Sequence, residues 1–288
     1  MPTDLESLGI PTPANARPGD ELYQKTQSAS VEDSPFDPPA ELVEIPSHGY
    51  LYKNATDDQD VLDGKIRIRP MTVREEKILA TARLVKSGQA LDLLFKNCIK
   101  SKIDTQELLS SDRSFLMIYL RNVSYGNIYK FNLTCPNTAC QRKFETEVDL
   151  TGHPVKELTD PTAQEPFEIV LPVSKQKVLF RLPRGKDEME IMKLQNQPKR
   201  MNEADEDTVK RLTSCILKIT RPDGTVISDK DKNAVVESWI ARDSSTLRNE
   251  LEKRDCGVED IKGIKCPYCG ETFDSPIPIT ENFFRVTE

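Results

Sequence analysis

Four cysteines stand in two pairs whose spacing suits metal binding. Cys266 and Cys269 form a C-x-x-C pair, and Gly270 can supply a positive φ directly after it. A second pair, with C-x4-C spacing, lies far upstream. Each pair can hold a metal ion from a tight turn, and a structural zinc site takes four ligands. We therefore predict one structural Zn²⁺ per chain that ties the two halves together, with the ligands Cys135, Cys140, Cys266 and Cys269.

Other interpretations of these cysteines stay open. The pairs could be degenerate and hold no metal, or each could join a pair in another chain. His153 could act as a ligand, although a lone histidine after Gly152 is more typical of a loop. Glutaredoxin-like proteins share the letters C-P-Y-C, but their first cysteine begins a helix. Pro276 and Pro278 oppose a long helix here, so redox catalysis is disfavoured.

The remaining cysteines have a plainer interpretation. Cys98 and Cys215 fall on apolar faces of predicted helices, where a cysteine packs as a small hydrophobic residue. Cys256 precedes the second metal-binding pair and is expected to cap a helix end or to be a spare thiol.

Motifs of catalysis are missing from the sequence. It contains no glycine-rich phosphate loop, no G-x-S-x-G and no H-E-x-x-H. The acidic pairs Glu75-Glu76 and Asp187-Glu188 stand at predicted helix starts, where they complement the helix dipole. We therefore do not expect an enzyme.

The elements that must position the cysteines occur twice along the chain. Each half opens with alternating apolar residues typical of a β-hairpin, at 41–45 with 65–69 and at 167–171 with 177–182. Amphipathic helices follow at 72–85, 91–98 and 116–123 in the first half. In the second half they are expected at 186–194, 209–216 and 236–240, with an extra stretch through Leu247 and Leu251.

Each cysteine pair is then followed by a similar strand. Counted from the second cysteine of each pair, Phe144, Glu145, Val148 and Leu150 match Phe273, Asp274, Ile277 and Ile279. We predict an internal duplication and an α+β fold of two similar units, each a β-hairpin, about three helices and a zinc-ribbon-like β knuckle. The predicted boundaries are residues 41–151 for the first unit, 152–166 for a linker and 167–288 for the second unit.

Residues 1–40 differ from the rest of the chain. They hold seven of the 20 prolines, and seven acidic residues against two basic ones. Such a segment buries too little apolar surface to order itself, so we expect a disordered arm, as a solvated leader or as a tether that folds on a partner. The net charge of −7 disfavours a coat for nucleic acid. No membrane span or signal peptide is recognisable.

Several short motifs follow one another in a particular order along the first unit. They are the run from Ile66 through Arg69, Pro70, Glu75 and Leu79, then Asn97, Cys98, Asp104, Asp112, Phe115, Leu120, Arg121, Ser124, Gly126, the Cys135–Cys140 pair and Leu150. Their order resembles the baseplate protein family of T-even-like bacteriophages. The resemblance covers residues 41–150 and, more faintly, 167–280.

This resemblance implies a structural or assembly role in the baseplate of a contractile tail, at or near its hub. It implies no catalysis, other tail proteins as partners, and a place in the virion or, during assembly, in the host cytoplasm. Here the unit occurs twice and a long acidic arm precedes it. An intramolecular pair of units could then do what two chains do elsewhere, although the oligomeric state stays open.

The alternative to a baseplate protein is a zinc-ribbon protein associated with nucleic acid or transcription. The acidic pI of about 5.2 and the lack of a stripe of basic and aromatic residues disfavour direct phosphate contact.

Overall fold

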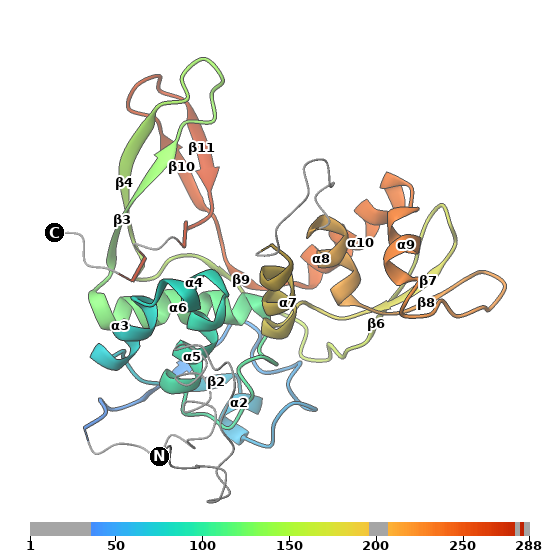
Figure 1. The fold of residues 1–288 in the computed structure, drawn as a ribbon, viewed down its shortest axis with the longest axis horizontal. Coiled ribbons are helices and arrows are strands. Elements are labelled where there is room, and N and C mark those ends of the chain that lie inside the picture. Colours follow the sequence, from blue (N-terminus) through green and yellow to red (C-terminus); the bar gives the residue numbers. More distant parts are fainter. Residues whose placement is uncertain (1–35, 196–206, 280–282, 285–288) are drawn as a thin grey trace, which may run out of the picture.

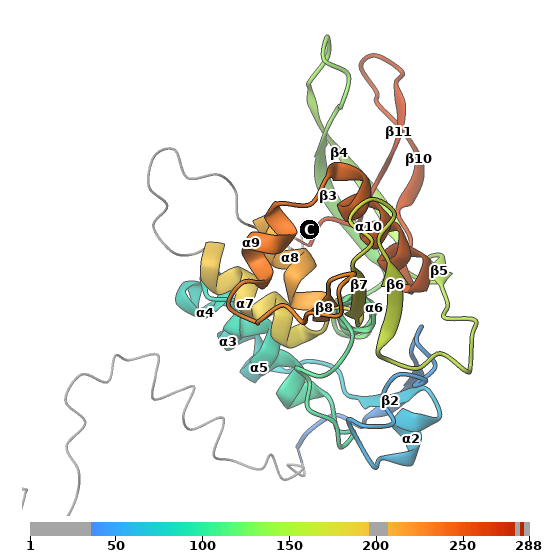
Figure 2. The ribbon, with the colours of Figure 1, turned by 90° about the vertical axis from the view of Figure 1, so that its right-hand side faces the viewer.

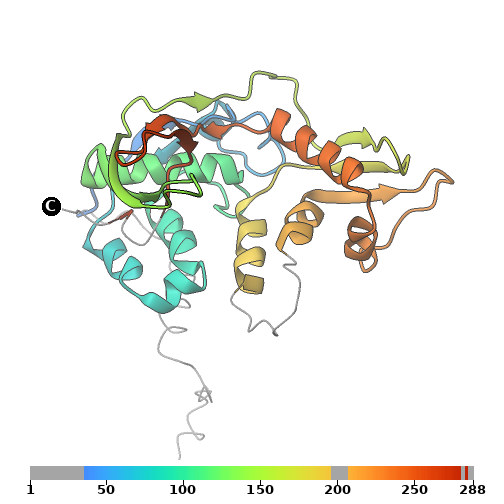
Figure 3. The same ribbon diagram turned by 90° about the horizontal axis from the view of Figure 1, so that it is seen from above.

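The computed structural model describes residues 36–195, 207–279 and 283–284 (Figure 1). It combines helices with small antiparallel sheets, which agrees with the predicted α+β class. Helices α3–α6 lie at one end of the long axis and α8–α10 with β6–β8 at the other, with α7 between these two groups (Figures 1 and 3). The prediction of a disordered arm concerns mostly residues 1–35, which lie outside the described residues. In the described part of the chain, no helix is long and apolar enough to cross a membrane.

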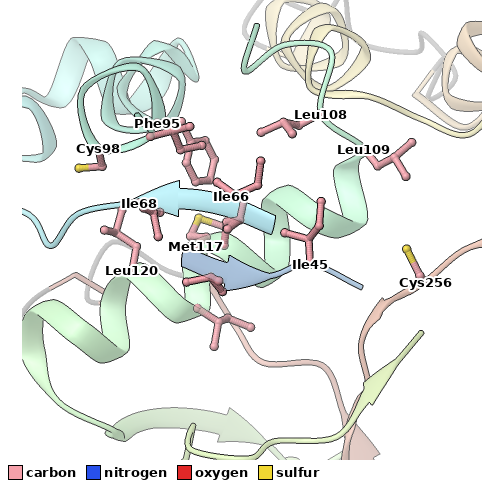
Figure 4. Packing of buried hydrophobic residues seen from close by; sticks show 14 of the residues in the cluster. Ile45, Ile66, Ile68, Phe95, Cys98, Leu108, Leu109, Met117, Leu120 and Cys256 are labelled. Carbon is pink, nitrogen blue, oxygen red and sulfur yellow. The ribbon is translucent and has the colours of Figure 1, made fainter. Parts of the chain in front are cut away.

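The first half is built around a two-stranded antiparallel sheet. Val43 pairs with Ile66, and alternation along β2 buries Ile66 and Ile68. These side chains pack with those of α5 and α6 in the main core (Figure 4). The elements are β1 (Glu41–Glu44), α2 (Gln59–Leu62), β2 (Lys65–Ile68), α3 (Val73–Leu79), α4 (Ala82–Lys86), α5 (Gln89–Cys98) and α6 (Ser110–Tyr125).

The second half is built around a three-stranded antiparallel sheet of order β6-β7-β8. Its core packs Leu171, Val178, Phe180, Ile219 and Leu247. The elements are β6 (Phe167–Val170), β7 (Lys177–Phe180), α7 (Gly185–Gln195), α8 (Asp207–Cys215), β8 (Ile216–Thr220), α9 (Lys232–Glu237) and α10 (Ala241–Arg254).

Two predicted helices differ from those observed. The helix expected at 72–85 is divided into α3 and α4, because Thr81 takes an extended conformation with ψ of 95° and begins α4. The helix expected at 209–216 ends at Cys215, and Ile216 opens β8 and pairs with Phe180. Tertiary pairing of the apolar residues therefore overrides the helical pattern at this end.

Helices α6 and α10 each make a similar contact near their first turn. Asp112 and Asp243 are each the third residue of their helix. The Asp112 carboxylate accepts the backbone N–H of Ser47 at 3.1 Å, and the Asp243 carboxylate accepts that of Val173 at 2.8 Å. Both contacts tie the helix to the turn after the first strand of its half. The helix predicted at 236–240 only partly overlaps α9, which ends at Glu237.

Two β-hairpins close the two halves and stand next to each other (Figures 1 and 2). The first pairs β3 (Ile128–Thr134) with β4 (Lys143–Asp149), and the second pairs β10 (Ile261–Lys265) with β11 (Thr272–Ser275). Phe144 and Phe273 meet edge to face across them, with ring centroids 6.3 Å apart. This contact places the end of the second half against the first half.

Two further contacts join the halves. In the predicted linker, β5 (Val155–Lys156) pairs with β9 (Gly257–Val258), and Leu158 is buried in the main core. Near the chain's end, Phe283 is fully buried against Tyr129, and its carbonyl accepts a hydrogen bond from Arg121 Nε at 3.1 Å. The C-terminal segment therefore packs on the first half.

Arg113 of α6 contacts the start of α7. Its guanidinium donates to the Thr105 carbonyl at 2.6 Å and to the Glu188 carboxylate at 3.1 Å. A Cβ at Gly185 would lie 2.7 Å from this guanidinium, so a side chain at this position would displace the guanidinium of Arg113.

Candidate metal centre

The four predicted cysteines come together at the far ends of the two hairpins. Cys135 and Cys140 lie between β3 and β4, and Cys266 and Cys269 lie between β10 and β11. All four sulfurs lie within 4.8 Å of one another. The Sγ atoms of Cys135 and Cys269 are 3.6 Å apart, and those of Cys140 and Cys266 are 4.0 Å apart. The closest contacts thus cross between the hairpins.

The two turns that carry the cysteines have matching hydrogen bonds. The N–H of Cys135 donates to the Arg142 carbonyl at 3.0 Å, and the N–H of Cys266 donates to the Glu271 carbonyl at 2.8 Å. The residue after each second cysteine has a positive φ, 46° at Gln141 and 77° at Gly270. The positive φ predicted at Gly270 is confirmed. Both thiols of each turn therefore lie in the four-cysteine cluster.

Apolar side chains pack against the inner side of the cysteine cluster. Phe144, Ile264, Cys135 and Cys266 form a small buried core of their own, separate from the cores of the two halves. On the outer side Cys269 is exposed, and the guanidinium of Arg142 lies 5.1 Å from the centre of the Tyr268 ring. The four cysteines therefore lie at the boundary between a small apolar core and solvent.

The arrangement fits a four-coordinate metal ion. A Zn–S bond of about 2.3 Å implies sulfurs roughly 3.8 Å apart in a tetrahedron, and the observed contacts of 3.6 and 4.0 Å lie on either side of that value. Burial tends to raise the pKa of the Cys266 thiol, but hydrogen bonds from the backbone of Cys269 and Tyr268 outweigh it and lower the pKa to about 7. These donors favour a thiolate, which is the form that binds metal.

The remaining cysteines and His153 lie away from the cluster. Cys98 and Cys215 are buried at the ends of α5 and α8, as expected for core residues. Cys256 is buried beside Ser111, with Sγ 3.4 Å from Oγ. The His153 ring contacts the Glu259 carbonyl at 2.8 Å. Among the described residues, only the four predicted cysteines form a group that could hold a metal ion.

Comparison with known proteins adds one family. A family model described as T4 bacteriophage base plate protein matches residues 52–285, most of the chain. The chain belongs to the T4 bacteriophage base plate protein family. No curated protein and no solved structure matches it.

The family match confirms the resemblance to phage baseplate proteins that the sequence showed. It begins in the first half and runs through both cysteine pairs of this base plate protein. The second half is therefore part of what this chain shares with the family. Both hairpins of the candidate metal centre lie within the matched residues.

The base plate protein also contains a buried ion pair in each half, which sequence reasoning missed. In the first half, the Arg69 guanidinium holds the Glu75 carboxylate at 3.0 and 3.2 Å. Burial alone would raise the pKa of Glu75, but Arg69 and Thr72 hold it below its usual value. In the second half, Arg181 holds Asp187 at 2.7 and 2.8 Å.

These ion pairs have the same surroundings. The backbone N–H of Arg69 donates to the Cys98 carbonyl, and that of Arg181 donates to the Cys215 carbonyl, both at 2.9 Å. A signal was available in the sequence, because in both halves an arginine precedes an acid by six positions. The acids were interpreted only as partners of the helix dipole, and Glu75 in addition completes a capping box with Thr72.

Proposed function

We propose that this baseplate protein works by docking other tail proteins on a scaffold of two units, without catalysis, and that its cysteine cluster binds one structural Zn²⁺. The family match carries the baseplate role. The position within the baseplate, at or near the hub, and the identity of the partners belong to the proposal.

The donor set supports zinc. Four thiolates in a tetrahedral arrangement are typical of zinc or iron–sulfur sites, and a site with four protein ligands leaves no position for a substrate. Bound there, the metal would fasten the last hairpin to the first. Small β-hairpins gain stability from such a metal because binding is coupled to folding. Cys135, Cys140, Cys266 and Cys269 are the proposed ligands.

The repeated contacts support an internal duplication. The pairs Arg69 with Glu75 and Arg181 with Asp187 have the same geometry, and Asp112 and Asp243 bind the corresponding turns of their halves. We place the units at residues 41–151 and 167–288, joined by residues 152–166. In this arrangement β5 and β9 pair across the join, which would help the two units to act as one scaffold.

The use of the buried acids supports a role without catalysis. Asp112 accepts hydrogen bonds from Ser47 and from the Tyr52 hydroxyl at 2.6 Å. Asp187 accepts from Arg181 and from the Arg184 backbone at 2.8 Å. Their carboxylates accept hydrogen bonds from donors inside the scaffold, whereas a catalytic acid or base must reach a substrate.

Quantitative mass spectrometry of purified phage particles, with the infected-cell lysate beside it, tests this function. We expect the chain at a fixed stoichiometry in particles, or else in the lysate bound to tail proteins as a transient assembly factor. A chain that is absent from particles and co-purifies with no tail protein would contradict the proposal.

A further inference from the structure

The first half binds a carboxylate supplied by the segment before β1. The side chain of Asp37 is only 7% exposed and lies among three cations. Its carboxylate oxygens are 3.5 Å from Arg69 Nε, 3.6 Å from Arg74 and 3.7 Å from Lys100 Nζ. The ion pair between Arg69 and Glu75 presents the Nε edge of Arg69 to this carboxylate. The first half therefore contains a carboxylate-binding site, and Asp37 occupies it.

The second half has the same site in a changed form. Arg181 takes the place of Arg69, since both donate to the carbonyl of the buried cysteine. Lys186 takes the place of Arg74, because each directly precedes the acid held by the arginine. Leu217 takes the place of Lys100, two positions beyond that cysteine.

These three second-half residues line an open cavity of about 750 Å³. Its other walls come from the loop of residues 50–55, from Glu107 and from Glu165. This volume lies within the range of about 300–1,000 Å³ that is usual for ligand pockets. Where the first half is filled by Asp37, the second half thus presents a cavity lined by the equivalent side chains.

The charges of the cavity favour an anionic segment. Arg184, Lys186, Arg181 and Lys53 supply positive charge, and Glu107 and Glu165 supply negative charge. Glu107 pairs with Lys186 at 2.7 Å, and Glu165 pairs with Arg184 at 2.7 Å. Asp187 also holds Arg181, so four basic side chains at the cavity face three acidic ones and a net positive charge remains. Tyr50 and Leu217 add apolar surface for the neighbours of a bound carboxylate.

We propose that this cavity binds an extended acidic segment of another tail protein, with one carboxylate placed against Arg181 and Lys186 as Asp37 lies against Arg69 and Arg74. The inference rests on the proposed docking role and names the kind of partner. Residues 36–40, with two prolines after the aspartate, show the chemistry of such a segment. Its prolines favour an extended backbone that loses little entropy on binding.

A synthetic peptide with the sequence of residues 32–41 serves as the probe, titrated by calorimetry into the full-length chain. We expect one peptide per chain and binding at least about tenfold weaker for the peptide with Asp37→Asn, because a charge-assisted contact is lost. Lys186→Ala should weaken binding to a similar degree. Arg74→Ala, its counterpart in the first half, should leave binding unchanged. Both side chains are about half exposed, so both variants should fold.

Three results would overturn the inference. They are no binding at millimolar peptide, equal binding of the Asp37→Asn peptide, and loss of binding in Arg74→Ala but not in Lys186→Ala. The last would mean that the probe displaces the chain's own arm from the first half. If peptide binding fails while the chain remains at fixed stoichiometry in particles, only this inference falls and the docking role stands.

Discussion

The Sγ atoms of Cys135 and Cys269 lie 3.6 Å apart, although 134 residues separate the two positions in the chain. This contact links the turn of the first hairpin to the turn of the last. Metal binding there would close a long loop and hold the C-terminal segment on the first half, where Phe283 is buried. We make four predictions about stability and structure.

Removal of metal should loosen the last hairpin first. A strong chelator should make residues 257–279 susceptible to limited proteolysis while the cores of both halves remain protected, because β10–β11 has only a small core of its own. Mass spectrometry of the fragments locates the cuts. Cys256→Ser should behave as wild type, whereas Cys266→Ser should be susceptible without chelator. Uniform cleavage along the whole chain would contradict this order of events.

The ion pair between Arg69 and Glu75 should be strongly coupled to folding. Both side chains are fully buried, so Arg69→Met leaves an uncompensated buried carboxylate and should lower the free energy of unfolding by about 3–5 kcal/mol. Denaturant unfolding measures the change. Arg67→Ala, which removes an exposed pair with Asp60, should cost less than about 1 kcal/mol. Equal losses of unfolding free energy in Arg69→Met and Arg67→Ala would contradict the predicted coupling of the buried pair to folding.

Asp112 and Asp243 should respond to pH in opposite ways. Burial raises the pKa of Asp112 to about 6, from 3.8, despite its hydrogen bonds. A raised pKa in the folded state means that the contribution to stability is complete below about pH 4 and is lost as pH rises through about 6. The stability of wild type relative to Asp112→Asn should therefore fall between pH 4 and 7, by up to about 3 kcal/mol.

Asp243 is the matched control. Burial tends to raise its pKa, but the backbone N–H groups of Val173 and Ser174 outweigh this and lower it. Its contribution is therefore present above the unfolded pKa and is lost only at more acidic pH. The difference between wild type and Asp243→Asn should stay flat from pH 4 to 7. A flat curve for Asp112→Asn as well would contradict the shift at Asp112.

Phe283 should stabilise the molecule although it lies near the end of the sequence. Its fully buried ring packs against Tyr129 and Phe284, so Phe283→Ala should lower the free energy of unfolding by about 3–5 kcal/mol. Val170→Ala, at a side chain that is 56% exposed, should change it by less than about 0.5 kcal/mol. A small effect at Phe283 would mean that this segment contributes little to the fold.

The cysteine cluster was the part of the structure most open to sequence reasoning. Cys266 and Cys269 carry a local motif, and a four-ligand rule demands partners for them, so Cys135 and Cys140 could be found without knowing the fold. The helix 91–98 and the strand 65–69 were predicted because the apolar periodicity of each is regular.

Contacts between distant residues were not predictable in this way. The similar contacts of α6 and α10 depend on Asp112 and Asp243 binding turns that lie far back in the chain, which hydrophobic spacing does not reveal. The pairing of β5 with β9 involves only two residues on each strand, too short for a periodic signal. Phe283 lies beyond every recognised motif, and only its contact with Tyr129 shows its role.

The metal content of the purified full-length chain, measured by elemental analysis together with native mass spectrometry, shows whether the cysteine cluster holds zinc. We expect one zinc ion per chain on a monomer mass, retained in Cys256→Ser and lost in Cys266→Ser. A chain that contains no metal after purification under reducing conditions with zinc present, or whose zinc content is unchanged by Cys266→Ser, would contradict the proposed site.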